Sequence, residues 1–251
     1  MESPVRKLIP FAGLSALILL AGPIAAEQSA TFTVSQHGAT VGTASFNILP
    51  NSAGYNSTSL VRVNMQGLDY ALSKTEKLSP ARKLVHVQLS GIVNNSAVNV
   101  VAKPDETQFL VNISANGRSS TTQLAGHDRT VFLPDFDPGA LETLLALAAK
   151  NNNRDLWVII PKQAGSVAPV QLATYPDERG TLNGKPLTVH HLVATIAGAQ
   201  TDLFSGPDNQ LLQAELQQPG FALVRKGFVL TPPAKPIGPP PAPGAPAQQS
   251  K

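Results

Sequence analysis

The chain of 251 residues contains no cysteine. This absence excludes a disulfide framework, a thiol nucleophile and the lipid-bearing cysteine of an acylated export product. Among exported proteins of this length, such an absence is more typical of a bacterial envelope than of a eukaryotic secretory route. Sequons of the form N-x-S/T at Asn56, Asn94 and Asn112 leave glycosylation open if the host is eukaryotic.

Charged and aromatic residues are both scarce, at 14% and 5% of the chain. The 19 Lys and Arg residues form no run, so the concentrated basic face that nucleic-acid binding requires is missing. We therefore expect no nucleic-acid partner. Because aromatic side chains are few, the interior has to consist mainly of Val, Leu, Ile and Ala, with Phe109, Phe132, Phe204 and Phe221 as larger anchors.

Long apolar runs are lacking except at the start of the chain. Residues 8–21 form an apolar segment behind Arg6 and Lys7, and small residues lead up to Ala26. This order is typical of a secretory signal peptide, which we place at residues 1–26. We expect the mature protein to be exported, to the periplasm or the cell exterior. No second apolar run approaches the roughly 20 residues that a membrane-spanning helix needs, so no integral membrane segment is expected after cleavage.

From residue 31 to about 229, short segments rich in Val, Thr, Leu and Phe alternate with Gly, Asn, Asp and Pro. This pattern predicts antiparallel β structure. Asn116-Gly117 and Asn183-Gly184 carry the strongest hairpin signal, because both residues of such a pair adopt positive φ in a type I′ turn. We expect hairpins over residues 107–124 and 179–196, and a further turn at Gly206–Asn209.

The composition divides the chain into three parts. Residues 1–26 are the signal peptide, and residues 27–230 are predicted to form a single β-rich domain. Residues 231–251 hold eight of the 22 prolines and no apolar periodicity. This proline-rich tail is predicted to be disordered and extended, as a passive linker or as a ligand for a groove-type recognition domain.

One segment departs from the period of two. Asp137 and Pro138 have the residue types of an N-cap and a first helical residue. Four apolar residues follow at helical spacing before Lys150 and three asparagines end the run. We expect an amphipathic helix that covers the concave side or the open edge of the sheet. Its apolar face consists of Leu141, Leu144, Leu145 and Ala148.

Reactive side chains form no recognisable constellation. His190-His191 is the only histidine cluster, but adjacent strand residues point to opposite faces, so the pair is a poor metal site. Asp135 and Asp137 could act as a carboxylate pair, although capping the helix already accounts for Asp137. The nucleophile elbow G-x-S-x-G and the phosphate-binding glycine loops are absent. We expect no metal and no cofactor.

The order of features along residues 31–226 has a counterpart in a known family. The features are glycines at strand starts, the lone helix, one hairpin and a terminal meander, at Gly38, Val41-Gly42, Gly54-Tyr55, Asp137, 180–196, Leu203-Phe204, Asp208, 211–215, Gly220 and Arg225. In this order they resemble the bacterial exported domain of unknown function numbered 3108, although Phe204 stands where that family usually has Trp. The resemblance implies a strongly curved antiparallel sheet, a half-open β-barrel similar to the lipoprotein and lipid carriers of the bacterial periplasm. It implies no established activity.

These observations favour a non-catalytic envelope protein that binds a lipid, an acylated protein segment or another amphipathic ligand in the concave sheet. A closed and filled core explains the apolar strands equally well. Two alternatives stay open: an enzyme with a scattered site including His190, His191, Asp202 or Asp208, and a structural protein acting through edge strands and the tail. The residues expected to bind the ligand come from the helix and from two-sided apolar strands: Leu141, Leu144, Leu145, Ala148, Phe109, Val111, Leu192 and Ile196.

Overall fold

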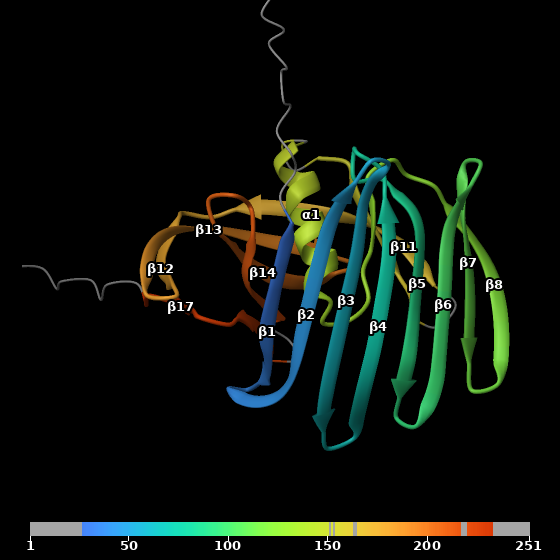
Figure 1. The fold of residues 1–251 in the computed structure, drawn as a ribbon, viewed down its shortest axis with the longest axis horizontal. Coiled ribbons are helices and arrows are strands. Elements are labelled where there is room, and N and C mark those ends of the chain that lie inside the picture. Colours follow the sequence, from blue (N-terminus) through green and yellow to red (C-terminus); the bar gives the residue numbers. More distant parts are fainter. Residues whose placement is uncertain (1–26, 151, 153, 163–164, 217–219, 233–251) are drawn as a thin grey trace, which may run out of the picture.

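The computed structural model describes residues 27–150, 152, 154–162, 165–216 and 220–232. The predicted signal peptide and nearly all of the predicted proline-rich tail lie outside these residues. Within the described part, the chain is mainly β with one helix and a large, curved, non-closed sheet, as predicted from the sequence (Figure 1). No helix in this part is long and apolar enough to cross a membrane.

The first half of the chain is an antiparallel meander in which each strand pairs with the next. The predicted turn at Asn116-Gly117 is confirmed, because both residues have positive φ and join two paired strands. The strands are β1 (Gln28–Gln36), β2 (Ala39–Asn51), β3 (Gly54–Met65), β4 (Leu68–Leu78), β5 (Leu84–Val93), β6 (Ser96–Asp105), β7 (Gln108–Ala115) and β8 (Arg118–Ala125).

The second half returns to the meander and joins its first strand. It comprises β9 (Thr130–Phe132), α1 (Pro138–Lys150), β10 (Leu156–Ile160), β11 (Ser166–Thr174), β12 (Glu178–Leu182), β13 (Lys185–Ile196), β14 (Ala199–Ser205), β15 (Leu211–Leu216), β16 (Phe221–Arg225) and β17 (Phe228–Leu230). Strand β9 runs parallel to β10, and the remaining pairs are antiparallel. From β10 the order of neighbours is β11, β13, β14, β15, β16 and then β1. The sheet therefore has β8 at one end and β9 at the other.

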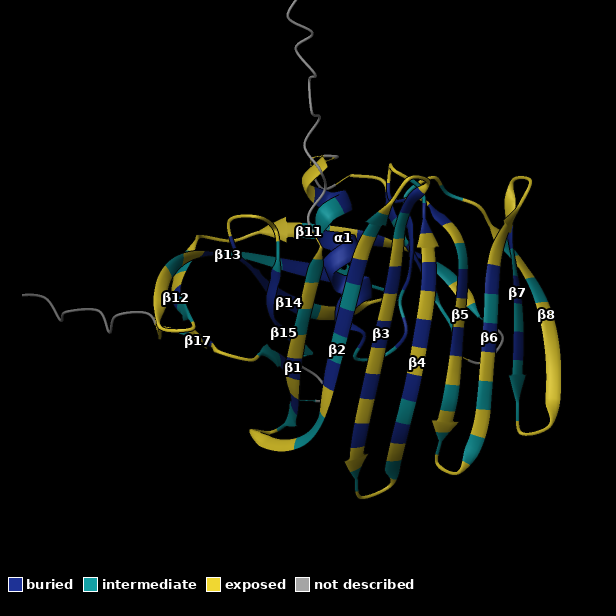
Figure 2. Cartoon of the chain, viewed as in Figure 1, coloured by how far each residue is buried: buried dark blue, intermediate teal, exposed yellow. Residues whose placement is uncertain are grey.

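Alternation along the strands places apolar residues on the concave face, where they form the main core (Figure 2). Helix α1 lies against this face and is buried almost throughout. Its start matches the prediction, because Asp137 Oδ1 accepts a hydrogen bond from the Ala140 amide at 3.1 Å. The helix is therefore part of the core rather than a cover over a wet surface.

Strand β13 divides its pairing between two partners. Its first half, from Lys185, pairs with β12, and its second half, ending at Ile196, pairs with β11. The predicted hairpin at Asn183-Gly184 is thus present, but it is shorter than β13 itself. Strands β12 and β17 lie over the opposite face of the sheet and form a small second core there. This second core consists of Val189, Phe204, Leu212 and Phe228.

Candidate functional site

The structure separates the eight residues that the sequence suggested for ligand binding. Two of them, Leu141 and Ile196, line one cavity. Phe109 lines a different cavity, and Leu192 is half-buried against the main core. The other four are packed inside the main core and line none of the described cavities: Leu144, Leu145, Ala148 and Val111.

The cavity shared by Leu141 and Ile196 has a volume of about 410 Å³. It lies at the N-terminal end of α1, between the segment Leu133–Asp137 and the inner face of β13–β16. The end of β10 closes a third side. Its floor is apolar and is formed by Leu133, Phe136, Leu141, Ile160, Ala194, Ile196, Leu216 and Leu223.

Phe136 has an unusual backbone conformation at this floor. Its φ is +57°, a region that a bulky side chain rarely occupies. The ring is held edge-on between Tyr70, with centroids 5.9 Å apart, and Phe221, at 4.8 Å. These two contacts hold Phe136 in the strained conformation, which is a feature found at binding and catalytic sites more often than elsewhere.

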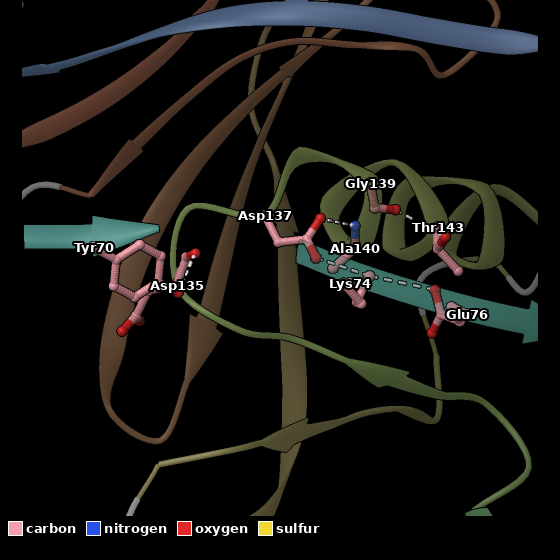
Figure 3. Close-up of polar contacts among 8 residues, drawn as sticks. All are labelled: Tyr70, Lys74, Glu76, Asp135, Asp137, Gly139, Ala140 and Thr143. Atoms are coloured by element: carbon pink, nitrogen blue, oxygen red, sulfur yellow. Dashed lines mark hydrogen bonds and ion pairs between the residues drawn. The ribbon is translucent and has the colours of Figure 1, made fainter. Parts of the chain in front are cut away.

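Tyr70 also fixes the segment that carries the rim of the cavity. Its hydroxyl donates a hydrogen bond to the backbone carbonyl of Asp135 at 3.1 Å (Figure 3). Burial raises the pKa of Tyr70 above its ordinary value, and the carboxylates of Asp135 and Asp137 raise it further. The hydroxyl therefore remains protonated and available as a donor at any physiological pH.

The rim of the cavity is polar and partly exposed. Lys162 Nζ lies 2.9 Å from Asp135 Oδ1, and the two side chains are 63% and 38% exposed. Gln200 and Thr201 of β14 line the same cavity. The site thus combines an apolar floor with two exposed opposite charges and neutral hydrogen-bonding groups.

A cluster of buried charges lies on the other side of the same loop. Lys74 Nζ is 2.9 Å from Asp137 Oδ2 and 3.3 Å from Glu76 Oε2, and all three side chains are at most 1% exposed (Figure 3). The hydroxyls of Ser57 and Ser59, on the neighbouring strand, are buried beside them without a hydrogen-bond partner in the described structure. The alternation of β4 places Lys74 and Glu76 on the concave face together with Tyr70, so these charges belong to the core side of the sheet.

The cluster holds two carboxylates for one cation. Burial raises the pKa of Glu76, and Lys74 counteracts this only in part. Burial alone would lower the pKa of Lys74, but the two carboxylates outweigh it and raise that pKa. The arrangement that avoids a surplus buried charge is therefore a charged Lys74, with Asp137 as its closer partner, beside a protonated Glu76.

A second carboxylate attaches α1 to the opposite wall of the sheet. Glu142 Oε2 accepts a hydrogen bond from the Leu211 amide at the start of β15, at 2.6 Å. Burial raises the pKa of Glu142, whereas this hydrogen bond and Arg225 act in the opposite direction. The helix is thus fixed to β4 through Asp137 and to β15 through Glu142.

The adjacent histidines contact different carboxylates. His190 Nδ1 lies 2.9 Å from Asp177, whereas His191 lies 3.3 Å from Glu178 and 2.8 Å from Asp202. The ring of His191 is stacked on Phe204, with centroids 4.6 Å apart. Within the described residues, no three His, Asp or Glu side chains are arranged to hold a metal ion.

The enzymatic alternative drew on four of these polar residues, of which the structure brings only two together. His191 and Asp202 are in contact, His190 points to the other face of β13, and Asp208 lies in the exposed loop before β15. Sequence reasoning missed Lys74, Glu76 and Phe136. The first two could have been found as charges in phase with Tyr70 and Leu72 on one face of a predicted strand.

Comparison with known proteins found no match: no family model, no curated protein and no solved structure matches this chain. The resemblance to the exported family described above therefore stays a prediction that rests on the order of features in the sequence.

Proposed function

We propose that this protein is an exported binding protein that holds the apolar part of an amphipathic ligand in the cavity beside the start of α1. The observation that carries the proposal is the apolar floor of this cavity of about 410 Å³. Its size falls in the range of roughly 300–1,000 Å³ that small-molecule sites occupy. Export rests on the predicted signal peptide, which lies outside the described residues.

The position of the helix supports this location over the rest of the concave face. Leu144 and Leu147 are buried to within 2% in the main core, so the middle of α1 leaves no room for a ligand. The loop before α1 instead borders an open cavity, and the Phe136 ring in this loop packs against Tyr70 and Phe221. The apolar surface beside Leu141 is therefore left unfilled by the side chains of the described structure.

The rim supports an amphipathic ligand over a purely apolar one. Lys162 and Asp135 are partly exposed, and an exposed ion pair contributes at most about 1 kcal/mol. The pair can therefore open so that one of the two side chains binds a charged head group instead. Gln200 and Thr201 offer neutral hydrogen bonds from the same strand. A lipid or an acylated protein segment has this combination of an apolar chain and a polar end.

Binding of a fluorescent fatty acid tests the proposal. Ile196→Trp fills the cavity and should weaken binding at least tenfold. Leu192→Trp is the matched control, because Leu192 is also half-buried on the concave face of β13 but does not line the cavity. Circular dichroism and thermal unfolding check that both variants keep the fold. Absence of saturable binding to the wild type, or equal binding by the two folded variants, would contradict the proposal.

A further inference from the structure

The two ends of the sheet are unequal. Strand β9 has three residues, pairs with β10 on one side and lies against β5. Strand β8 has eight residues and pairs with β7 alone among the strands that the structure describes. Within the part of the chain that the structure describes, the sheet therefore presents one long free edge, at β8 (Figure 1). A free edge carries unpaired N–H and C=O groups that can pair with another strand.

Strand β8 lacks the features by which proteins usually protect such an edge. Its register with β7 contains no bulge, and it has no proline. Its only charge is Arg118, at its first residue, and residues 119–125 are uncharged. Most of the strand is exposed on both faces (Figure 2). Only its C-terminal part is held from the inside, where Leu124 packs against the main core and β11 lies against the strand.

We propose that β8 pairs antiparallel with β8 of a second copy of this chain, forming a symmetric dimer with a continuous sheet. A second copy fits this edge because the paired residues carry no charge, so that two identical strands bring no like charges together. The single long edge also explains why the assembly stops at two. Once both copies have paired their β8 strands, only short edges remain, and a twofold contact closes on itself.

The geometry of antiparallel pairing restricts the register. Directly opposite residues are either both hydrogen-bonded or both non-hydrogen-bonded, and these two types alternate along a strand. When β8 pairs with its own copy, two residues that face each other must therefore have numbers that are both even or both odd. One residue then faces its own copy, and the twofold axis runs between these two copies. The midpoint of β8 lies between Thr121 and Thr122. The two registers with the greatest overlap place one of these threonines opposite its own copy.

The expected dimer is weak. Pairing of the two β8 strands buries less accessible surface than the roughly 1,200 Å² of a stable interface, and their polar side chains add little to the binding free energy. Sedimentation velocity of the full mature chain should show a monomer–dimer equilibrium that depends on protein concentration. Thr121→Lys/Thr122→Lys should shift it to monomer, because either register then opposes two lysines. Thr58→Lys/Ser90→Lys adds the same charge on exposed positions of β3 and β5 and should leave it unchanged.

Introduced cysteines provide a second test, since the chain has none of its own. In a self-paired edge, a cysteine on the twofold axis faces its own copy at a distance suited to a disulfide. Oxidation of Thr121→Cys or of Thr122→Cys should give a covalent dimer, with one of the two reacting much faster than Thr58→Cys. Monomer at every concentration, or cross-linking no faster than in Thr58→Cys, would overturn the proposal. Chains longer than a dimer would overturn the argument from a single edge.

Discussion

The two walls that face the start of α1 are filled in opposite ways. On the β3–β4 side, Lys74 and Glu76 meet Asp137 in a cluster almost free of solvent. On the β13–β16 side, Ile196 and Leu223 face an open cavity. Charged side chains are packed tightly at the first wall, whereas the apolar side chains of the second wall border an open cavity. In most protein interiors the tightly packed side chains are the apolar ones. Charges fix the loop to one wall, and the other wall is left free to accept a ligand.

The comparison leads to a large expected effect on the charged wall. Lys74→Met removes the cation of this cluster and leaves the buried Asp137 without its partner, so we expect a loss of about 3–5 kcal/mol in the free energy of unfolding. Denaturant unfolding measures it. Lys77→Met on the exposed face of the same strand is the control.

The double variant Lys74→Met/Asp137→Asn should recover much of that loss, because it removes both partners of the buried ion pair while an asparagine can still cap α1. A loss below 1 kcal/mol in Lys74→Met would contradict the description of the cluster as a tight ion pair.

A smaller effect distinguishes the core from the cavity. Leu144→Ala removes a fully buried side chain of α1 and should cost about 2–5 kcal/mol. Ile196→Ala only enlarges a space that is already open, so its cost should stay near 1 kcal/mol, the usual value for a typical substitution. Thermal and denaturant unfolding of both variants measure the difference. Equal costs would mean that Ile196 is packed as tightly as Leu144.

The smallest expected effect is a dependence on pH. The pKa of Glu76 in the folded protein is raised above its unfolded value of 4.5, so folding favours the protonated form. Its stabilising effect is complete below 4.5 and is lost as pH rises toward the folded pKa. Glu76→Gln cannot ionise, and its stability relative to the wild type should therefore increase with pH.

Free energies of unfolding at pH 4 and pH 8 test this dependence, with the exposed Asp105→Asn as control. The raised pKa of Glu142 affects both chains equally and cancels in the difference. A difference between Glu76→Gln and the wild type that shrinks as pH rises would contradict the assignment of a protonated Glu76.

The features that sequence reasoning could predict were those with a local cause. Asn116-Gly117 specifies its turn through backbone conformation, and Asp137 specifies the helix start through one capping hydrogen bond. The cavity has no such cause. Leu141 and Ile196 meet only because β13–β16 pair with β1 and curve back toward the helix. The same helical spacing that singled out Leu141 also singled out Leu144 and Leu145, which are core residues.

Strand β1 joins the two halves of the sheet, because Phe32 faces Ala44 of β2 on one side and Arg225 of β16 on the other. The pairing with β16 links positions almost 200 residues apart, which is a slow step for a folding chain. The sheet cannot be completed until nearly the whole domain has been synthesised. For a chain that is exported as we propose, this delay is an advantage: the nascent polypeptide stays open enough to be threaded across a membrane and folds only after its last strands arrive.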